Sequence, residues 1–271
     1  MDGDERLRLA LDRVSAALRE VVEELQVTEP ELRAALAFLG EVSQAGQLPL
    51  LSDVLGVSVA VDDVTYSAER QGTASSVEGP FYRPGAPMRT QICRDDEPGD
   101  VCFVSGRVTD ATTGAPLPGV LLDVWQAGAG GKYEHEDPEQ PNYNLRGRLS
   151  TDDQGNYEFR TVVPPPYEIP PGPVNRLLAM VARNRFRPAH FHVKLSGAGY
   201  EPRTTQLFLE GGAHLDDDTI GAVKPELTGW LEKHDDPEQL SRRGLDRPFF
   251  TYAYDFALVP ATSKEGAGDG P

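Results

Sequence analysis

The apolar positions near the N-terminus recur with the spacing of an amphipathic helix. They step by four and three residues, which places them on one face of a helix. Such a stripe needs a partner surface, because its side chains would otherwise face water. The positions are Leu7, Leu11, Val14, Leu18, Val21 and Leu25.

Two further helices are expected before the chain changes character. Thr28 and Glu31 have the spacing of a capping box, and Pro30 suits a first helical turn. A second helix is therefore predicted from this cap to about Gln44. A third helix, predicted from Leu50 to about Asp63, is apolar on several sides and is expected to be buried.

Beyond Glu69 the pattern becomes that of strands and turns. Short β-branched and aromatic runs alternate with glycine and proline turns, and we expect no helices between them. This predicts a mainly β fold, with an antiparallel β-sandwich as catalytic core and an α-helical N-terminal part. We expect a helical region over 1–68, a sandwich domain over 69–260 and a flexible tail over 261–271. The strands are predicted at 101–108, 120–125, 148–151, 156–162, 189–195 and 204–209.

Two histidines stand out on one predicted strand. His190 and His192 are two residues apart, so their imidazoles point to the same face of a strand. Two imidazoles held side by side form half of a metal site. The spacing alone also fits a His-x-His pair on a solvated sheet face.

Two tyrosines outside periodic apolar runs complete the candidate donors. Tyr167 follows a run of prolines, and Tyr143 lies just before a predicted strand. A phenol has a pKa near 10, so only a strong Lewis acid such as Fe(III) keeps it deprotonated at neutral pH. Two histidines with two tyrosines would therefore favour ferric iron. The alternative is that both tyrosines are loop-packing aromatics.

A series of motifs resembles the intradiol ring-cleaving dioxygenases, in their catechol and hydroxyquinol 1,2-dioxygenase branch. The likeness runs in order from about Leu50 to about Leu231 and covers most of the chain. The motifs are Glu78-Gly79-Pro80-Phe81-Tyr82, Leu122-Asp123-Val124-Trp125-Gln126-Ala127, Tyr143-Asn144-Leu145-Arg146-Gly147, Tyr167-Glu168-Ile169-Pro170, Arg187-Pro188-Ala189-His190-Phe191-His192 and Thr204-Thr205-Gln206-Leu207.

The resemblance implies a complete site. One non-haem Fe(III) per chain would be bound by Tyr143, Tyr167, His190 and His192, with Tyr167 leaving the metal when substrate binds. Arg187 and Gln206 would act beside it, although Arg187 taken alone fits a surface ion pair. The implied substrate pocket contains Ala60, Asp63, Val77, Gly79, Pro80, Phe81, Ile169, Pro170, Thr219 and Ile220.

The implied reaction is cleavage of catechol, or a substituted catechol, by O₂ to cis,cis-muconate. The alternatives are a chlorocatechol 1,2-dioxygenase and a hydroxyquinol 1,2-dioxygenase giving maleylacetate, with Asp63 bonding the third hydroxyl. A non-enzymatic alternative is a transthyretin-like binding module, since a fold does not fix a function. The resemblance also implies a homodimer through the N-terminal helices, and it allows lipid between them.

The acidic composition of the chain limits the classes of partner that it can bind. With 271 residues, a net charge of −17 and a pI near 4.7, the chain lacks the basic character that nucleic acids and anionic membranes require. No apolar run approaches a membrane span, and no secretory signal is visible, so a cytoplasmic location is expected. In that reducing compartment Cys93 and Cys102 are expected to be free thiols.

Overall fold

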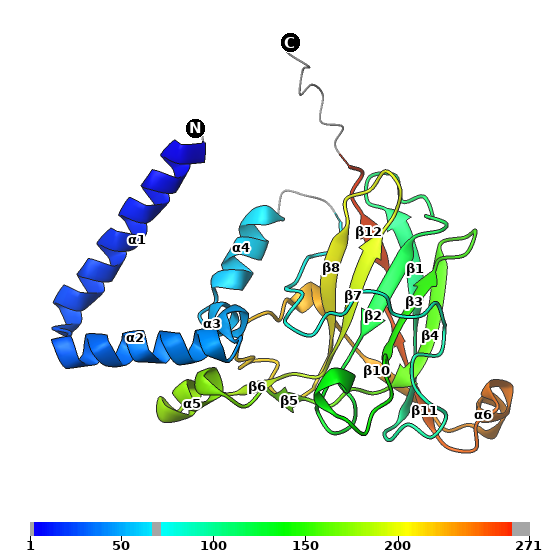
Figure 1. Ribbon diagram of the computed structural model, residues 1–271. Helices are drawn as coiled ribbons and strands as arrows, with labels where there is room; N and C mark the ends of the chain where they lie inside the picture. Colours follow the sequence, from blue (N-terminus) through cyan, green and yellow to red (C-terminus); the bar gives the residue numbers. More distant parts are fainter. Residues whose placement is uncertain (1–2, 67–71, 262–271) are drawn as a thin grey trace, which may run out of the picture.

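The computed structural model describes residues 3–66 and 72–261, and its centre is a sandwich of two five-stranded sheets (Figure 1). One sheet has the order β10-β11-β1-β12, with β4 also paired to β1, and the other has the order β3-β2-β7-β8-β9. The two sheets are formed by β1 (Val101–Asp110), β2 (Leu121–Trp125), β3 (Arg146–Ser150), β4 (Asn156–Val162), β7 (His190–Ser196), β8 (Arg203–Leu209), β9 (Thr228–Gly229), β10 (Leu231–His234), β11 (Phe249–Ala253) and β12 (Phe256–Leu258).

The six predicted strands are all present, and the fold class is confirmed with one refinement. The pairs of β2, β4 and β7 are antiparallel, as expected. However, β1 pairs in parallel with β11 and β12, and β8 pairs in parallel with β9, so both sheets are mixed. Alternate side chains of β1, β2, β7 and β8 meet between the sheets in one apolar core that includes Val104, Leu122, Val193 and Leu207.

The N-terminal part is helical, as predicted. Its helices are α1 (Gly3–Leu25), α2 (Glu29–Gln44), α3 (Leu48–Val54) and α4 (Val57–Thr65). The capping box at α2 is confirmed, because the Thr28 backbone N–H donates to the Glu31 carboxylate at 2.8 Å. The expected boundary between residues 68 and 69 lies outside the described residues, as does most of the expected tail.

The prediction of one buried helix from Leu50 to about Asp63 is wrong, because this segment forms two helices. Gly56 adopts a left-handed conformation with φ of +72°, which ends α3 and starts α4 in a new direction. The helix α3 buries Leu50 and Val54 in the core, whereas α4 has no buried residue and only packs Val59, partly buried, against it. Two helices between the strands, α5 (Pro173–Met180) and α6 (Pro237–Arg243), were not expected.

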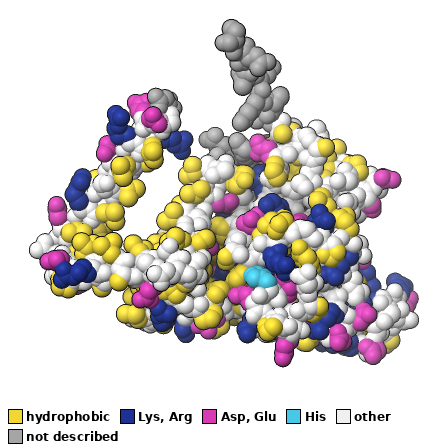
Figure 2. Space-filling model, in the orientation of Figure 1, with side chains coloured by type: hydrophobic (Ala, Val, Ile, Leu, Met, Phe, Trp, Pro, Cys, Tyr) yellow, Lys and Arg dark blue, Asp and Glu magenta, His cyan; other side chains and the backbone are white. Residues whose placement is uncertain are grey.

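The helices α2, α3 and α5 pack beside β8 around a second apolar cluster. Val42, Leu50, Val174 and Phe208 are among its buried members. In contrast, α1 projects away from the sandwich, and Figure 2 shows its hydrophobic side chains along the side that faces α4. The whole predicted stripe is exposed, with Leu7 at 69% and Leu25 at 68%. No described helix is long and apolar enough to cross a bilayer.

Candidate metal centre and active site

The strand β7 holds the two predicted histidines together inside the protein. It lies between β2 and β8 in its sheet, and both imidazoles point to the same face, as alternation predicts. The Nε2 atoms of His190 and His192 are 3.1 Å apart. Both side chains are buried, so the alternative of a solvated His-x-His pair is wrong.

Burial keeps both imidazole rings neutral, and a hydrogen bond to the backbone orients the ring of His190. His190 Nδ1 lies 2.7 Å from the Pro188 carbonyl, which must accept, so the proton sits on Nδ1 and the Nε2 lone pair points into the cluster as an acceptor. Burial, aided by the Arg187 charge, lowers the pKa of His190 to about 3. Burial likewise lowers the pKa of His192 well below its ordinary value.

Two buried tyrosines face these histidines. Tyr167 lies on β5 (Tyr167–Glu168), which pairs with β6 (Phe186–Arg187), and its ring centroid is 5.5 Å from that of His190. Tyr133 is 1% exposed, and its ring is 5.7 Å from Tyr167 and 6.2 Å from His192. Stacking on Phe81 at 4.3 Å fixes the Tyr133 ring. Burial raises the pKa of both phenols.

The structure corrects the predicted donor set, because Tyr143 is not part of this cluster. Its hydroxyl donates to the Pro84 carbonyl at 3.0 Å, and its ring lies beneath the Arg83 guanidinium. The chain between β2 and β3 makes a long excursion, and its 3₁₀ turn η1 (Glu134–Glu136) directs Tyr133 inward and leaves Tyr143 outside. Sequence reasoning missed Tyr133, although the glycine-rich run just before it marks a sharp change of direction.

The donor atoms fit a ferric ion. No group of three His, Cys, Asp or Glu residues within 3–66 and 72–261 is arranged to hold a metal, so a metal here requires the tyrosines. Tyr133 Oη is buried, makes no hydrogen bond of normal geometry within those ranges, and has the Tyr167 phenol as its polar neighbour. A buried hydroxyl without a partner is costly, and a metal ligand bond would remove that cost. Phenolate oxygen with imidazole nitrogen suits Fe(III).

Arg187 and Gln206 lie beside the histidines, as predicted. Arg187 Nη2 donates to Gln206 Oε1 at 2.8 Å, and Gln206 Nε2 donates to the Val77 carbonyl at 2.6 Å. Arg187 Nη1 is 3.2 Å from His190 Nε2. The guanidinium does form an ion pair, with Asp218 at 3.2 Å, but both side chains are buried rather than on the surface.

Asp218 was not anticipated. Burial acts to raise its pKa, but Arg187 and the Ala222 backbone N–H outweigh burial, so the pKa of Asp218 is lowered. The carboxylate therefore stays charged and holds the guanidinium in place. Burial also acts to lower the pKa of Arg187, and Asp218 reverses this effect.

A small cavity lies between this cluster and the helices. It is narrow, with a volume of about 10 Å³, and is bounded by Tyr167, Arg187 and His192. Six predicted pocket residues line it, and α3 adds two that were not predicted, Leu50 and Asp53. The six are Gly79, Pro80, Phe81, Ile169, Pro170 and Ile220.

Four predicted pocket residues do not line this cavity. Ala60 is exposed on α4, and Asp63, with 56% of its side chain exposed, pairs with Lys224 Nζ at 2.8 Å. The break at Gly56 turns α4 away and leaves Asp53 of α3 facing the cavity instead. Val77 contributes its carbonyl to Gln206, and the Thr219 hydroxyl donates to the Asn184 carbonyl at 2.8 Å.

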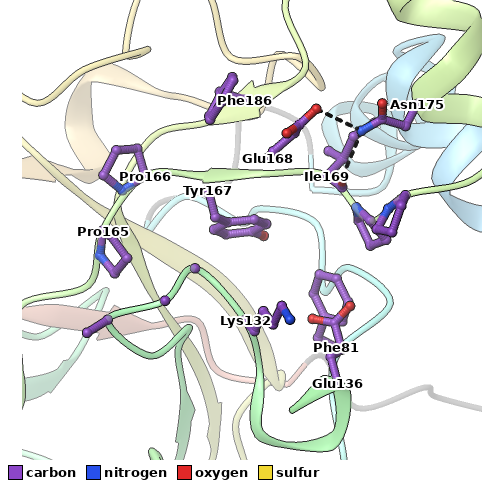
Figure 3. A pocket seen from close by; sticks show the side chains of 15 residues that line it. Phe81, Lys132, Glu136, Pro165, Pro166, Tyr167, Glu168, Ile169, Asn175 and Phe186 are labelled. Carbon is purple, nitrogen blue, oxygen red and sulfur yellow. Dashed lines mark hydrogen bonds between the residues drawn. The ribbon is translucent and has the colours of Figure 1, made fainter. Parts of the chain in front are cut away.

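A wider pocket adjoins the cavity on the side of Tyr167 and shares Phe81, Tyr167, Ile169 and Pro170 with it. Figure 3 shows the Tyr167 ring between the prolines of its own loop and Phe81. Asn175 on α5 holds this loop, because its amide donates to Glu168 Oε1 at 3.2 Å and to the Ile169 carbonyl at 3.0 Å. The loop is therefore held directly on the C-terminal side of Tyr167.

Comparisons with known proteins agree with this geometry. A family model described as "Dioxygenase" matches residues 77–260, and one described as "Catechol dioxygenase N terminus" matches residues 4–73. A chlorocatechol 1,2-dioxygenase of Rhodococcus opacus is 37% identical over 83% of this chain and 89% of its own length. A hydroxyquinol 1,2-dioxygenase of a Rhizobium strain is 35% identical, with coverages of 94% and 90%.

Solved structures show the same architecture. The 3-chlorocatechol 1,2-dioxygenase of Rhodococcus opacus superimposes with a TM-score of 0.87 at 37% identity, over 96% of this chain and 100% of the other. A catechol 1,2-dioxygenase of an Acinetobacter strain gives a TM-score of 0.88 at 31% identity, over 100% and 92%. The alternative of a transthyretin-like module without catalysis is therefore set aside. The chain is an enzyme that belongs to the intradiol ring-cleavage dioxygenase family.

Proposed function

We propose that this enzyme binds one Fe(III) per chain and cleaves catechol between its two hydroxyl-bearing carbons with O₂, giving cis,cis-muconate. The observation that carries the proposal is the convergence of two phenols and two imidazoles in one buried site. The proposed ligands are Tyr133, Tyr167, His190 and His192, so Tyr133 replaces Tyr143 in the predicted set. When bound, the ferric ion would supply a Lewis acid and a template for the diol.

Tyr167 is the residue that we propose to accept a proton from the substrate. Its side chain lines the cavity, and burial raises the pKa of its phenol. A phenolate in such a setting takes up a proton readily when it is displaced, so Tyr167 Oη would receive one proton of the incoming diol. Tyr133 does not line the cavity, and its ring is packed between Phe81 and Tyr167.

Arg187 is proposed to stabilise negative charge that develops on the ring. It lines the cavity, it is buried, and its orientation is fixed by Asp218 and Gln206. A cation held in advance in a site shielded from water stabilises developing charge without reorganisation. Gln206 orients Arg187 and is itself held by the Val77 carbonyl.

The cavity also bears on the choice of substrate. Leu50, Phe81, Ile169 and Ile220 give it apolar walls that suit an aromatic ring, and Asp53 adds a carboxyl group. Burial raises the pKa of Asp53. A third ring hydroxyl could hydrogen-bond to this carboxyl, and this observation favours hydroxyquinol, giving maleylacetate, as a second candidate substrate. The role foreseen for Asp63 thus passes to Asp53.

We also propose that the enzyme is a homodimer formed through α1. The apolar stripe of this helix is exposed from Leu7 to Leu25, and none of its residues is buried within the described chain. A stripe of this length in water favours a second apolar helix as partner. Sedimentation at several concentrations, with Leu18→Glu as the disrupting variant, would test the assembly.

Product analysis tests the reaction and ranks the substrates together. Purified, iron-loaded enzyme is supplied with O₂ and, separately, catechol, 4-methylcatechol, 4-chlorocatechol and hydroxyquinol. The proposal expects muconates from the catechols, seen as an ultraviolet increase, and uptake of both oxygen atoms into the product. A yellow semialdehyde would instead show cleavage outside the diol and would contradict both the proposed reaction and the ferric site.

A further inference from the structure

The sheet that carries His192 also carries a buried arginine in the same row. In register across four strands, Arg146 on β3 pairs with Trp125 on β2, Trp125 pairs with His192 on β7, and His192 pairs with Gln206 on β8. Directly paired residues of neighbouring strands point to the same face. Trp125 stacks on His192 with ring centroids 4.6 Å apart and planes 7° apart. The strand register that positions His192 therefore also positions Arg146.

Arg146 extends from this row to the residue that follows Tyr133. Its Nε donates to Glu134 Oε2, and both side chains are 1% exposed. Its Nη2 lies 3.2 Å from His135 Nδ1, and its guanidinium carbon is 5.7 Å from the centre of the Tyr133 ring. Glu134 also accepts from Arg83, which is half-buried. The ion pair therefore ties the loop to the sheet directly beside Tyr133.

This pair is poorly explained by stability alone. Two charges buried together contribute little net stability, and apolar residues of similar size often serve as well. Arg146 Nη1 is in addition buried without a hydrogen-bond partner within the described ranges. What the pair provides is a fixed direction, because a guanidinium and a carboxylate bind in a defined geometry.

We propose that Glu134 and Arg146 are positioning residues that hold the Tyr133 phenol in register with His192 at the metal site. The inference rests on the proposed function, because it assigns Tyr133 as an iron ligand. The tyrosine lies on an irregular loop and the histidine on a paired strand, so a link between them is needed to keep both donor atoms directed at one point. The ion pair is that link.

The test compares three variants with a matched control. Arg146→Lys keeps the positive charge but loses the planar guanidinium group. Glu134→Gln keeps the size of the side chain but loses its negative charge. The double variant Glu134→Met, Arg146→Met replaces the ion pair by apolar side chains. Arg243→Lys is the control, because Arg243 makes a bidentate ion pair with Glu158 away from the site. Its Nη1 and Nη2 atoms donate to the two carboxylate oxygens at 2.6 and 2.9 Å. The readouts are Fe(III) affinity, the visible phenolate-to-iron absorption band and the melting temperature of the metal-free protein.

The proposal expects all three site variants to bind Fe(III) about 10–100-fold more weakly, as is usual for partners of metal ligands, and to shift the visible band. The double methionine variant should do so while its metal-free melting temperature stays close to that of the wild type. Arg243→Lys should leave affinity and band unchanged. Wild-type affinity and band in the double methionine variant, or changes only in melting temperature, would overturn the inference. A wild-type protein without the band would instead refute the iron site itself.

Discussion

The two halves of the proposed metal site are held in different ways. His190 and His192 lie on β7, which is hydrogen-bonded on both sides, so their directions follow from strand alternation alone. Tyr133 lies on an irregular loop, and Tyr167 lies on a two-residue strand between prolines and α5. The histidines are therefore fixed by local geometry and the tyrosines by distant contacts. A short sequence pattern reveals the first kind of ligand much better than the second.

Removing the Tyr133 hydroxyl should produce the largest loss of Fe(III) affinity. Tyr133→Phe deletes the donor oxygen and leaves the stacking on Phe81 in place. We expect Fe(III) affinity to fall by more than about 100-fold, because a direct ligand matters more than its supporting partners, which account for about 10–100-fold. The matched control is Tyr143→Phe, which removes only the hydrogen bond to Pro84 and should retain both iron and activity. An equal loss of Fe(III) affinity in the two variants would contradict the assignment of Tyr133, and not Tyr143, as the ligand.

Arg187→Lys should lower turnover while leaving iron in place. A lysine cannot reproduce the simultaneous contacts to Gln206, Asp218 and His190. Loss of one preorganised group that stabilises developing charge typically lowers kcat by about 100–1000-fold. Iron content should remain near one per chain, since Arg187 donates no ligand atom. A kcat like that of the wild type would refute the role.

Asp53→Ala should change the ranking of substrates more than the rate with catechol. The carboxyl group faces the cavity, and a third ring hydroxyl is the substrate group that it can bind. Loss of one such hydrogen bond costs about 1–3 kcal/mol, so kcat/KM for hydroxyquinol should fall by about 5–150-fold. Asp63→Ala is the control, because Asp63 lies on exposed α4 and pairs with Lys224. An unchanged ratio of hydroxyquinol to catechol would rule out Asp53 as the discriminating group.

The buried histidines should make the metal-free protein sensitive to acid. The pKa of His190 falls from 6.5 to about 3 on folding, and that of His192 is also lowered. The unfolded chain then binds protons that the folded chain does not, so the free energy of unfolding decreases as pH falls from about 6.5 towards 3. The slope is at most about 1.4 kcal/mol per pH unit for each histidine. Urea unfolding at several pH values measures it, and a His190→Asn, His192→Asn double variant should show a flatter dependence.

Much of the fold was predictable because its signals are local. Alternation located the six principal strands, and the capping box located the start of α2. The helix α6 was also within reach, since Asp236 caps it, Pro237 begins it and Gly244 ends it, yet we did not predict it. The break at Gly56 was harder to predict, because a glycine inside an apolar helical pattern is tolerated in many helices.

The site was predictable to the extent that its residues lie on regular elements. His190, His192, Arg187 and Gln206 come together as expected because β6, β7 and β8 bring them there. The choice of Tyr143 was wrong because proximity to a strand does not decide which way a loop residue points. The helical part of the pocket was wrong for a related reason, since a single change of helix direction exchanges Asp63 for Asp53.

Metal analysis combined with visible absorption tests the central claim most directly. The account predicts close to one iron per chain in protein purified with iron, and a visible band from phenolate-to-Fe(III) charge transfer. The band should change in both Tyr133→Phe and Tyr167→Phe and persist in Tyr143→Phe. A colourless protein that retains its fold but does not take up ferric iron, or a band that depends on Tyr143 instead of Tyr133, would contradict the account.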